Sequence, residues 1–207
     1  MPPDHLGIRF VLASASPARL ATLRRAGVTP EVLVSGIDED RITATSAAEL
    51  TQSLAAEKAA AVASRLTGPA LVLGCDSLLD FDGQPVGKPG TRTAAVARWR
   101  AMRGRFGVLH TGHHLLDVVS GRAATAIAST TVHFAEVTDE EIELYCGTDE
   151  PAGVAGAFTI DGLGGWFVTG VEGDPHTVVG LSLPLLRRLL GELGYSLRDI
   201  GYPAVPS

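Results

Sequence analysis

Two β-rich segments, residues 108–119 and 123–134, are separated only by the turn dipeptide Ser120-Gly121. A connection this short joins strands that pair antiparallel, so the segments predict a long hairpin. Near the start of the chain, the apolar run at residues 8–13 leads into a helix expected over residues 17–26, which is the strand-helix order typical of parallel sheets. Together the two patterns predict an α/β fold with a mixed β-sheet flanked by helices.

The rest of the chain supplies further elements for the same sheet. Strands are expected at residues 31–35 and 70–74, and the second leads towards a hairpin turn at Asp82-Gly83. Capping boxes at Ser46 to Glu49 and Thr138 to Glu141 mark the starts of helices. These helices are expected to end near residues 66 and 146; others are expected at 93–102 and 184–194, and residues 151–180 are glycine-rich and predicted to be irregular. Because no repeat, linker or boundary is visible, the 207 residues are predicted to form a single domain.

Charge and composition argue against several classes of function. A duplex nucleic acid partner calls for a basic face, whereas the net charge here is -6. No apolar run reaches membrane-spanning length, and residues 1–5 lack the basic and apolar stretches of a signal peptide. We therefore expect a cytoplasmic protein that binds neither nucleic acid nor membrane. Cys75 and Cys146 lack metal-type or redox-type spacing and are predicted to be free, buried thiols.

Charged residues stand near the ends of the predicted elements. The turn from Ser14 to Arg19 would present backbone N–H groups at a helix start, which suits an anion, with Arg19 as a possible bidentate clamp. The alternative is a simple helix cap with a solvated arginine. Asp38 and Glu39 follow the second strand, where paired carboxylates suit Mg²⁺, or else form a solvated turn.

Asp76 follows directly on the apolar run at residues 70–74. A carboxylate at a strand end is partly desolvated and needs a cation, as a metal ligand or general base would; the alternative is a turn-forming aspartate. Lys88, returned by the hairpin, would supply that charge or reach a phosphate. Lys58 interrupts an Ala-rich helix, where a lone lysine is usually exposed. As a set, these cations and carboxylates suit phosphoryl chemistry on a nucleotide.

Two other motifs are given structural interpretations. On a strand, His110 and His114 would share one face and His113 the other, with no third zinc ligand nearby, which favours a structural or surface role. Cys75 has no histidine placed to activate it as a nucleophile, so packing is favoured.

Four ordered motifs resemble the Maf family. "LASASPAR" (residues 12–19) resembles its "LASxSPRR" signature, and "GCDS" with "GKP" resembles "AADT…KP". "EPAGVAGAFTIDGLGG" and "VEGDPHTVVGLSLPLL" resemble the family's "EPxxKAGAYxIQGxG" and closing "IxGxxxNVxGLPL". The resemblance spans about residues 8 to 190. It implies a nucleoside triphosphate pyrophosphatase that cleaves between the α- and β-phosphates with a divalent cation, Mg²⁺ or Mn²⁺.

The resemblance also implies an elongated, inosine triphosphatase-like fold with two lobes around a cleft, often as a homodimer. By position, Asp76 matches the family's catalytic acid, described as a proton acceptor. Asp76 as a metal ligand, with a metal-bound water as nucleophile, is the other role left open. The further polar positions of the family's cleft are matched by Ser14, Arg19, Glu39, Lys58 and Lys88.

Three departures concern positions that the family associates with base selectivity. Ala18, Ser77 and Asp161 stand where arginine, threonine and glutamine are usual, so the family's preference for dTTP and UTP is not assumed here. Phe158, Asp161 and Trp166 are candidates for a base pocket, although such aromatic residues are more often packing anchors.

Two other functions are weighed against the enzyme. One is a nucleotide-binding regulator of cell division with little turnover, as the family's association with septum formation suggests. The other is a phosphatase that releases single phosphates, for which the chain lacks an N-terminal Asp-x-Asp motif.

Overall fold

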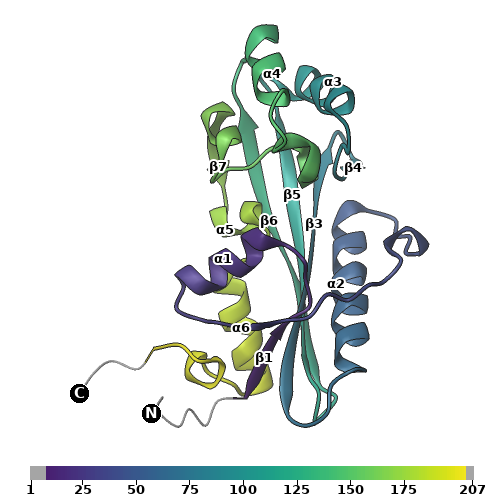
Figure 1. The fold of residues 1–207 in the computed structure, drawn as a ribbon, viewed down its shortest axis with the longest axis vertical. Coiled ribbons are helices and arrows are strands. Elements are labelled where there is room, and N and C mark those ends of the chain that lie inside the picture. The colour runs from purple at the N-terminus through teal and green to yellow at the C-terminus, as the bar shows by residue number, and fades with distance from the viewer. Residues whose placement is uncertain (1–7, 204–207) are drawn as a thin grey trace.

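Three strands of 12 residues each form the centre of the molecule: β3 (Ala70–Phe81), β5 (Phe106–Asp117) and β6 (Ala123–Phe134). They belong to a seven-stranded sheet in the computed structural model, which describes residues 8–203 (Figure 1). The strand order is β2-β1-β3-β5-β6-β7, with β4 also paired to β3. β1 is parallel to β2 and β3, whereas the other pairs are antiparallel. The predicted mixed sheet flanked by helices is therefore confirmed.

The remaining elements complete the sheet or cover it. The shorter strands are β1 (Arg9–Leu12), β2 (Glu31–Val32), β4 (Gln84–Val86) and β7 (Val168–Glu172). The helices are α1 (Pro17–Arg25), α2 (Ala47–Ala63), α3 (Arg92–Met102), α4 (Asp139–Cys146), α5 (Pro175–Val179) and α6 (Leu183–Leu193). None of the helices within residues 8–203 combines the length and apolar character needed to span a membrane.

Short-range capping signals predicted the helix starts well. Ser16 caps α1 by accepting a hydrogen bond from the backbone N–H of Arg19 (3.4 Å). The capping box of Thr138 and Glu141 is present at α4. At α2 only half of the predicted box forms: Ser46 accepts from the N–H of Glu49 (3.2 Å), but the Glu49 carboxylate turns back to Thr45 instead of Ser46.

Three predicted boundaries are wrong because strand pairing depends on distant residues. β3 does not stop near residue 74 but continues to Phe81, since β5 pairs with it as far as Asp80. Asp76 thus lies inside a strand, not at its end. β2 has two residues instead of the expected five at 31–35. The segment 151–180 contains β7 and α5, whereas it was predicted to be irregular. The predicted absence of a signal peptide concerns residues 1–5, which lie outside the described part.

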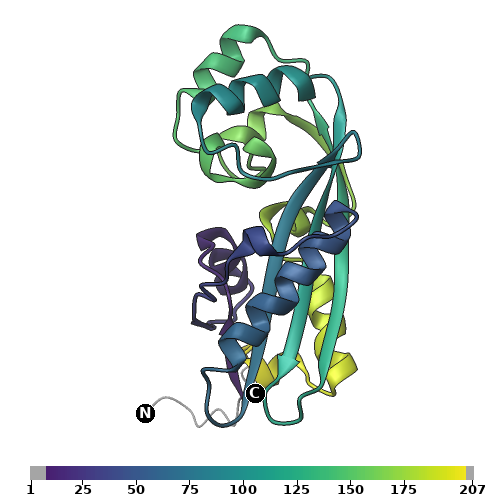
Figure 2. The ribbon, with the colours of Figure 1, turned by 90° about the vertical axis from the view of Figure 1, so that its right-hand side faces the viewer.

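The long strands carry two lobes, one at each end (Figures 1 and 2). The lower lobe contains β1, β2, α1, α2 and α6; the upper lobe contains β4, α3, α4 and residues 151–167. In the lower lobe, α2 covers one face of the sheet, and α1 and α6 cover the other. One hydrophobic core lies beneath α2, and a second lies beneath α1 and α6. The core of the upper lobe is built around the buried Trp99.

Two glycines let α2 lie directly on the sheet. A Cβ atom on Gly74 of β3 would collide with the carbonyl oxygen of Ala55, and one on Gly112 of β5 with that of Thr51. Gly74 and Gly112 lie on neighbouring strands beside Asp76, whose register partner is Gly112. This close approach brings Lys58, one turn along α2 from Ala55, against β3.

Candidate functional site

Most of the predicted site residues gather at an open edge of β3, defined here as residues 74–78: Ser14, Arg19, Glu39, Lys58, Asp76 and Ser77. β5 occupies one edge of β3 from Leu71 to Asp80. On the opposite edge, β1 pairs with β3 only as far as Leu73, and β4 pairs only from Leu79 onwards. On this edge, no strand among residues 8–203 pairs with the stretch between Leu73 and Leu79. This open edge separates the lower lobe's β1 from the upper lobe's β4.

Arg19 reaches the open edge from α1 and is held by four hydrogen bonds. Its Nε donates to the carbonyl oxygen of Gly180 (2.8 Å), and one terminal nitrogen donates to Ser14 Oγ (3.0 Å) and to the Cys75 carbonyl (2.9 Å). The other terminal nitrogen donates to Ser77 Oγ (3.0 Å). A guanidinium has five N–H donors, so one N–H is left for a ligand. Arg19 is therefore a structural tie between α1, β3 and α5 as well as a cation at the edge.

The Ser77 hydroxyl belongs to a chain of hydrogen bonds with fixed direction. Thr111 Oγ1 donates to the carbonyl oxygen of Thr177 (2.9 Å), so its own proton is used there. Ser77 Oγ lies 2.9 Å from Thr111 Oγ1 and must donate to it, while accepting from Arg19. Thr111 is fully buried and was not predicted as a site residue; its position between the histidines of β5 gave no signal for it.

Lys58 lies between two carboxylates. Its Nζ is 2.6 Å from Asp76 Oδ1 and 2.8 Å from Glu39 Oε1. Lys58 and Asp76 are less than a tenth exposed, whereas the Glu39 side chain is 53% exposed. The expectation that a lone lysine in this helix is solvent-exposed is thus wrong, because Gly74 and Gly112 allow α2 to pack close against the sheet. Burial makes each charge of the Lys58–Asp76 pair dependent on the other.

Successive side chains of a strand point to opposite faces, so Asp76 and Ser77 lie on different sides of the sheet. The Lys58 group approaches the open edge from the face covered by α2, and the Arg19 group from the face covered by α1. Two cations and two carboxylates thus surround one short stretch of backbone. Such an arrangement can bind an anion and accept a proton beside it.

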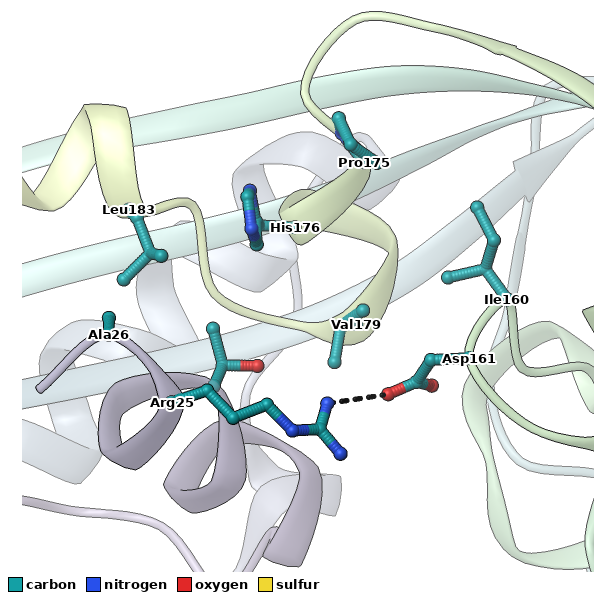
Figure 3. Close-up of a pocket in the computed structure, with 9 residues that line it drawn as sticks. Arg25, Ala26, Ile160, Asp161, Pro175, His176, Val179 and Leu183 are labelled. Carbon is teal, nitrogen blue, oxygen red and sulfur yellow. Dashed lines mark ion pairs between the residues drawn. The ribbon is translucent and has the colours of Figure 1, made fainter.

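Lys88 and Asp161 lie apart from this cluster. Lys88 is exposed in the connection between β4 and α3, which passes along the side of the upper lobe that faces the lower lobe (Figure 2). Among residues 8–203 it has no hydrogen-bond or ion-pair partner. Asp161 forms an ion pair with Arg25 at the end of α1, with Oδ2 and Nη1 3.8 Å apart (Figure 3). Both side chains are well exposed, so this pair adds little stability.

The Arg25–Asp161 pair crosses a pocket of about 410 Å³ between the lobes (Figure 3). Its walls come from α1, α5 and the loop that bears Asp161, and its lining residues are Thr22, Arg25, Ala26, Ile160, Asp161, Pro175, His176, Val179 and Leu183. The pocket does not include Asp76, Lys58 or Glu39, but it adjoins the cluster because Arg19 lies on α1 and contacts Gly180, next to Val179. Arg25 carried no sequence signal.

Two aromatic candidates for a base pocket do not line this pocket. Phe158 is a packing anchor in the upper-lobe core, at 3% exposure. Trp166 is 86% exposed and is not among the lining residues. Of the three candidates, only Asp161 lines the pocket.

The hydrogen bonds of His113 confirm the structural role predicted for it. Its Nδ1 lies 2.9 Å from the carbonyl oxygen of Thr111, so that nitrogen carries the proton, and Nε2 accepts from the backbone N–H of Ser182 (2.9 Å). Burial lowers the pKa of His113 to about 4. His110 and His114 bond to Ser129 and Thr125 on β6. No group of three or more His, Cys, Asp or Glu residues suited to a metal occurs within residues 8–203.

A pH dependence of stability follows from His113. The pKa of the imidazole is near 6.5 in the unfolded chain and about 4 in the folded protein, so between these pH values only the unfolded state binds the extra proton. The contribution of His113 to the free energy of unfolding should therefore be fully present above about pH 6.5. It should fall by about 3 kcal/mol as the pH decreases to about 4. Urea titrations of wild type and His113→Gln would test this. Parallel stability curves for the two proteins across that range would contradict it.

The cysteines match their predictions. Cys75 and Cys146 are free and buried. Burial raises the pKa of the Cys75 thiol to about 12, which leaves it unreactive at neutral pH. Packing, not nucleophilic attack, is its role beside Asp76.

Comparison with known proteins identifies relatives of this chain. The family model described as "Maf-like protein" matches residues 9–193. The nucleoside triphosphate pyrophosphatase of Salinispora tropica is 62% identical over 200 residues, covering 94% of this chain and 88% of that protein. The protein of the same name from Streptomyces coelicolor is 55% identical over 197 residues, covering 95% and 96% of the two chains.

A solved structure of the Staphylococcus aureus Ham1 protein aligns with 93% of each chain, at 13% identity and a TM-score of 0.46. That likeness is weak. The family match instead covers nearly the whole described chain, including the turn that holds Ser14 and Arg19, the β3 stretch with Asp76, and the Asp161 loop. The chain belongs to the Maf family.

Proposed function

We propose that this protein hydrolyses nucleoside triphosphates between the α- and β-phosphates, giving a nucleoside monophosphate and pyrophosphate. The observation that carries the proposal is the buried Lys58–Asp76 pair at the open edge of β3, with Arg19 beside it. Cations next to a partly desolvated carboxylate suit a reaction that neutralises phosphate charge and activates water. The names of the relatives from Salinispora and Streptomyces support the same activity.

Each charged residue has a proposed part in this reaction. Asp76 accepts the proton of the attacking water or binds the metal. Lys58, the remaining N–H of Arg19, and Lys88 from the facing lobe neutralise the phosphates. Ser14 and Ser77 hold Arg19 in place and border the phosphates.

A divalent cation, Mg²⁺ or Mn²⁺, belongs to the proposal. The donor set fits it, because Glu39 and Asp76 each contact Lys58 Nζ through one carboxylate oxygen, at 2.8 and 2.6 Å, so the second oxygen of each is left to bind a cation beside the lysine. Mg²⁺ is commonly held by one or two carboxylates, with waters and substrate phosphates as its other ligands. When bound, the cation would supply further neutralisation of phosphate charge. A cytoplasmic location and a homodimer remain predictions from the sequence.

The nucleobase is proposed to occupy the pocket beside α1 and α5. A volume of about 410 Å³ is within the usual range of small-molecule sites. Asp161 would contact the base there with carboxylate oxygens, which accept hydrogen bonds, in contrast to the mixed donor and acceptor of glutamine. Bases with a free N–H or amino group on that side are therefore the expected substrates.

Product analysis tests the activity. The purified protein would be incubated with Mg²⁺ or Mn²⁺ and a panel of standard, deaminated and methylated nucleoside triphosphates. We expect monophosphate and pyrophosphate in equal amounts, with no turnover in excess EDTA. Orthophosphate as the direct product would indicate a phosphatase. Nucleotide binding without turnover would indicate the regulator of cell division instead.

A further inference from the structure

Glu150 lies at the base of the loop that bears Asp161 and accepts four hydrogen bonds. Oε1 accepts from Tyr145 Oη and Thr159 Oγ1, each at 2.7 Å. The backbone N–H groups of Leu163 and Gly164 donate to Oε2 and Oε1, both at 2.9 Å. Three of the four donors belong to residues 159–164. The carboxylate is therefore bonded to both ends of this loop.

The loop between these donors is closely packed against Glu150. A Cβ atom on Gly162 would collide with Glu150 Oε2, and one on Gly164 would lie 2.6 Å from Tyr145 Oη. Ile160 and Asp161, between the bonded ends, both line the pocket. The Glu150 carboxylate itself does not reach the pocket.

We propose that Glu150 is a positioning residue for nucleobase recognition, which fixes residues 159–164 so that Asp161 meets the base at a set place. This rests on the proposed function, because it assumes that the pocket receives the base. All four partners are donors, so only an ionised carboxylate satisfies them together. Burial acts to raise the pKa of Glu150, but these hydrogen bonds outweigh it and lower the pKa.

The location of Glu150 predicts which kinetic constant depends on it. The loop belongs to the upper lobe and has no hydrogen bond or ion pair with Asp76 or Lys58, which bond to each other and to Glu39, so the chemical step should be preserved when the loop is loosened. Binding and discrimination between bases should suffer. This separates a positioning role from a general loss of folded protein, which lowers kcat for every substrate alike.

The test compares Glu150→Gln with wild type. The amide NH₂ of glutamine would replace either Oε2, where it faces the N–H of Leu163, or Oε1, which has the other three donors, so part of the network must break in both orientations. We expect faster amide hydrogen exchange in residues 159–164 and a KM about tenfold higher for the preferred nucleotide, with kcat within about threefold. The ratio of kcat/KM between preferred and poor bases should fall by a similar factor. Glu143→Gln on α4, which removes surface ion pairs with Arg92 and Arg100, is the matched control and should change none of these.

Unchanged exchange in the loop, or an equal loss for all bases, would overturn the proposal. If Glu150→Gln does not fold, Thr159→Val removes a single donor and should give the same pattern more weakly. Failure of the proposed function is recognised separately, by the absence of pyrophosphate release from wild type. Nucleotide dissociation constants across the same panel would then decide whether Glu150 sets base preference, and an unchanged preference in the variant would overturn it.

Discussion

Replacing Asp76 with asparagine is expected to lower kcat by about 10²- to 10⁴-fold while leaving the fold intact. Asparagine keeps the shape of the side chain and an oxygen for Lys58, but it neither accepts a proton nor carries the negative charge that a metal requires. Both roles proposed for Asp76 are lost together, so the size of the effect does not depend on which one applies. Single-turnover pyrophosphate release, with circular dichroism as a check of folding, measures it.

Asp80→Asn is the matched control for this variant. Asp80 lies on the same strand and, four residues away, on the same face of the sheet, but beyond the open edge. It should retain nearly full activity. Activity of Asp76→Asn within fivefold of wild type would show that Asp76 acts neither as base nor as metal ligand.

Lys58→Met is expected to destabilise the protein by about 3 kcal/mol and to abolish turnover. The substitution leaves the Asp76 carboxylate buried beneath α2 with its counter-ion removed, and the exposed Glu39 gives no compensation. Urea unfolding at pH 8 measures the change in free energy. Lys88→Met, the same substitution at an exposed lysine, should change stability by less than about 0.5 kcal/mol.

A double variant separates the buried charge from other causes of instability. In Lys58→Met with Asp76→Asn the uncompensated charge is gone, so at least half of the lost stability should return. If the two losses simply add, the ion pair is not the source of the effect.

Local signals predicted local structure in this chain. Ser16, Ser46 and Thr138 cap helices because a capping side chain bonds to a backbone N–H only two or three residues away. The length of β3 was underestimated because its polar residues are held in the strand by β5, whose partners lie 28 to 36 residues further along the chain, from Val108 opposite Asp80 to Gly112 opposite Asp76. β7 was missed because its pairing with β6 overrides a glycine-rich sequence.

In the candidate site, too, some residues were recognised from the sequence and others only from the fold. Arg19 and Asp76 stand in motifs and Lys58 interrupts an Ala-rich helix, and the charges of the three indicated phosphate chemistry. Their partners were not visible: Arg19 bonds to Gly180, which is 161 residues away, and Arg25 meets Asp161 only across the two lobes. Glu150 stands in a quoted motif, but only the folded loop gives its carboxylate four donors.

The long strands also determine how the molecule can admit a substrate. β3, β5 and β6 run without interruption from one lobe to the other, so the lobes share hydrogen-bonded ladders where hinged proteins have a flexible linker. Rotating one lobe against the other would mean twisting three strands at once. We therefore expect the separation between the proposed phosphate-binding edge and the Asp161 loop to be set before a nucleotide arrives, so that little binding energy is spent on closing the protein around it.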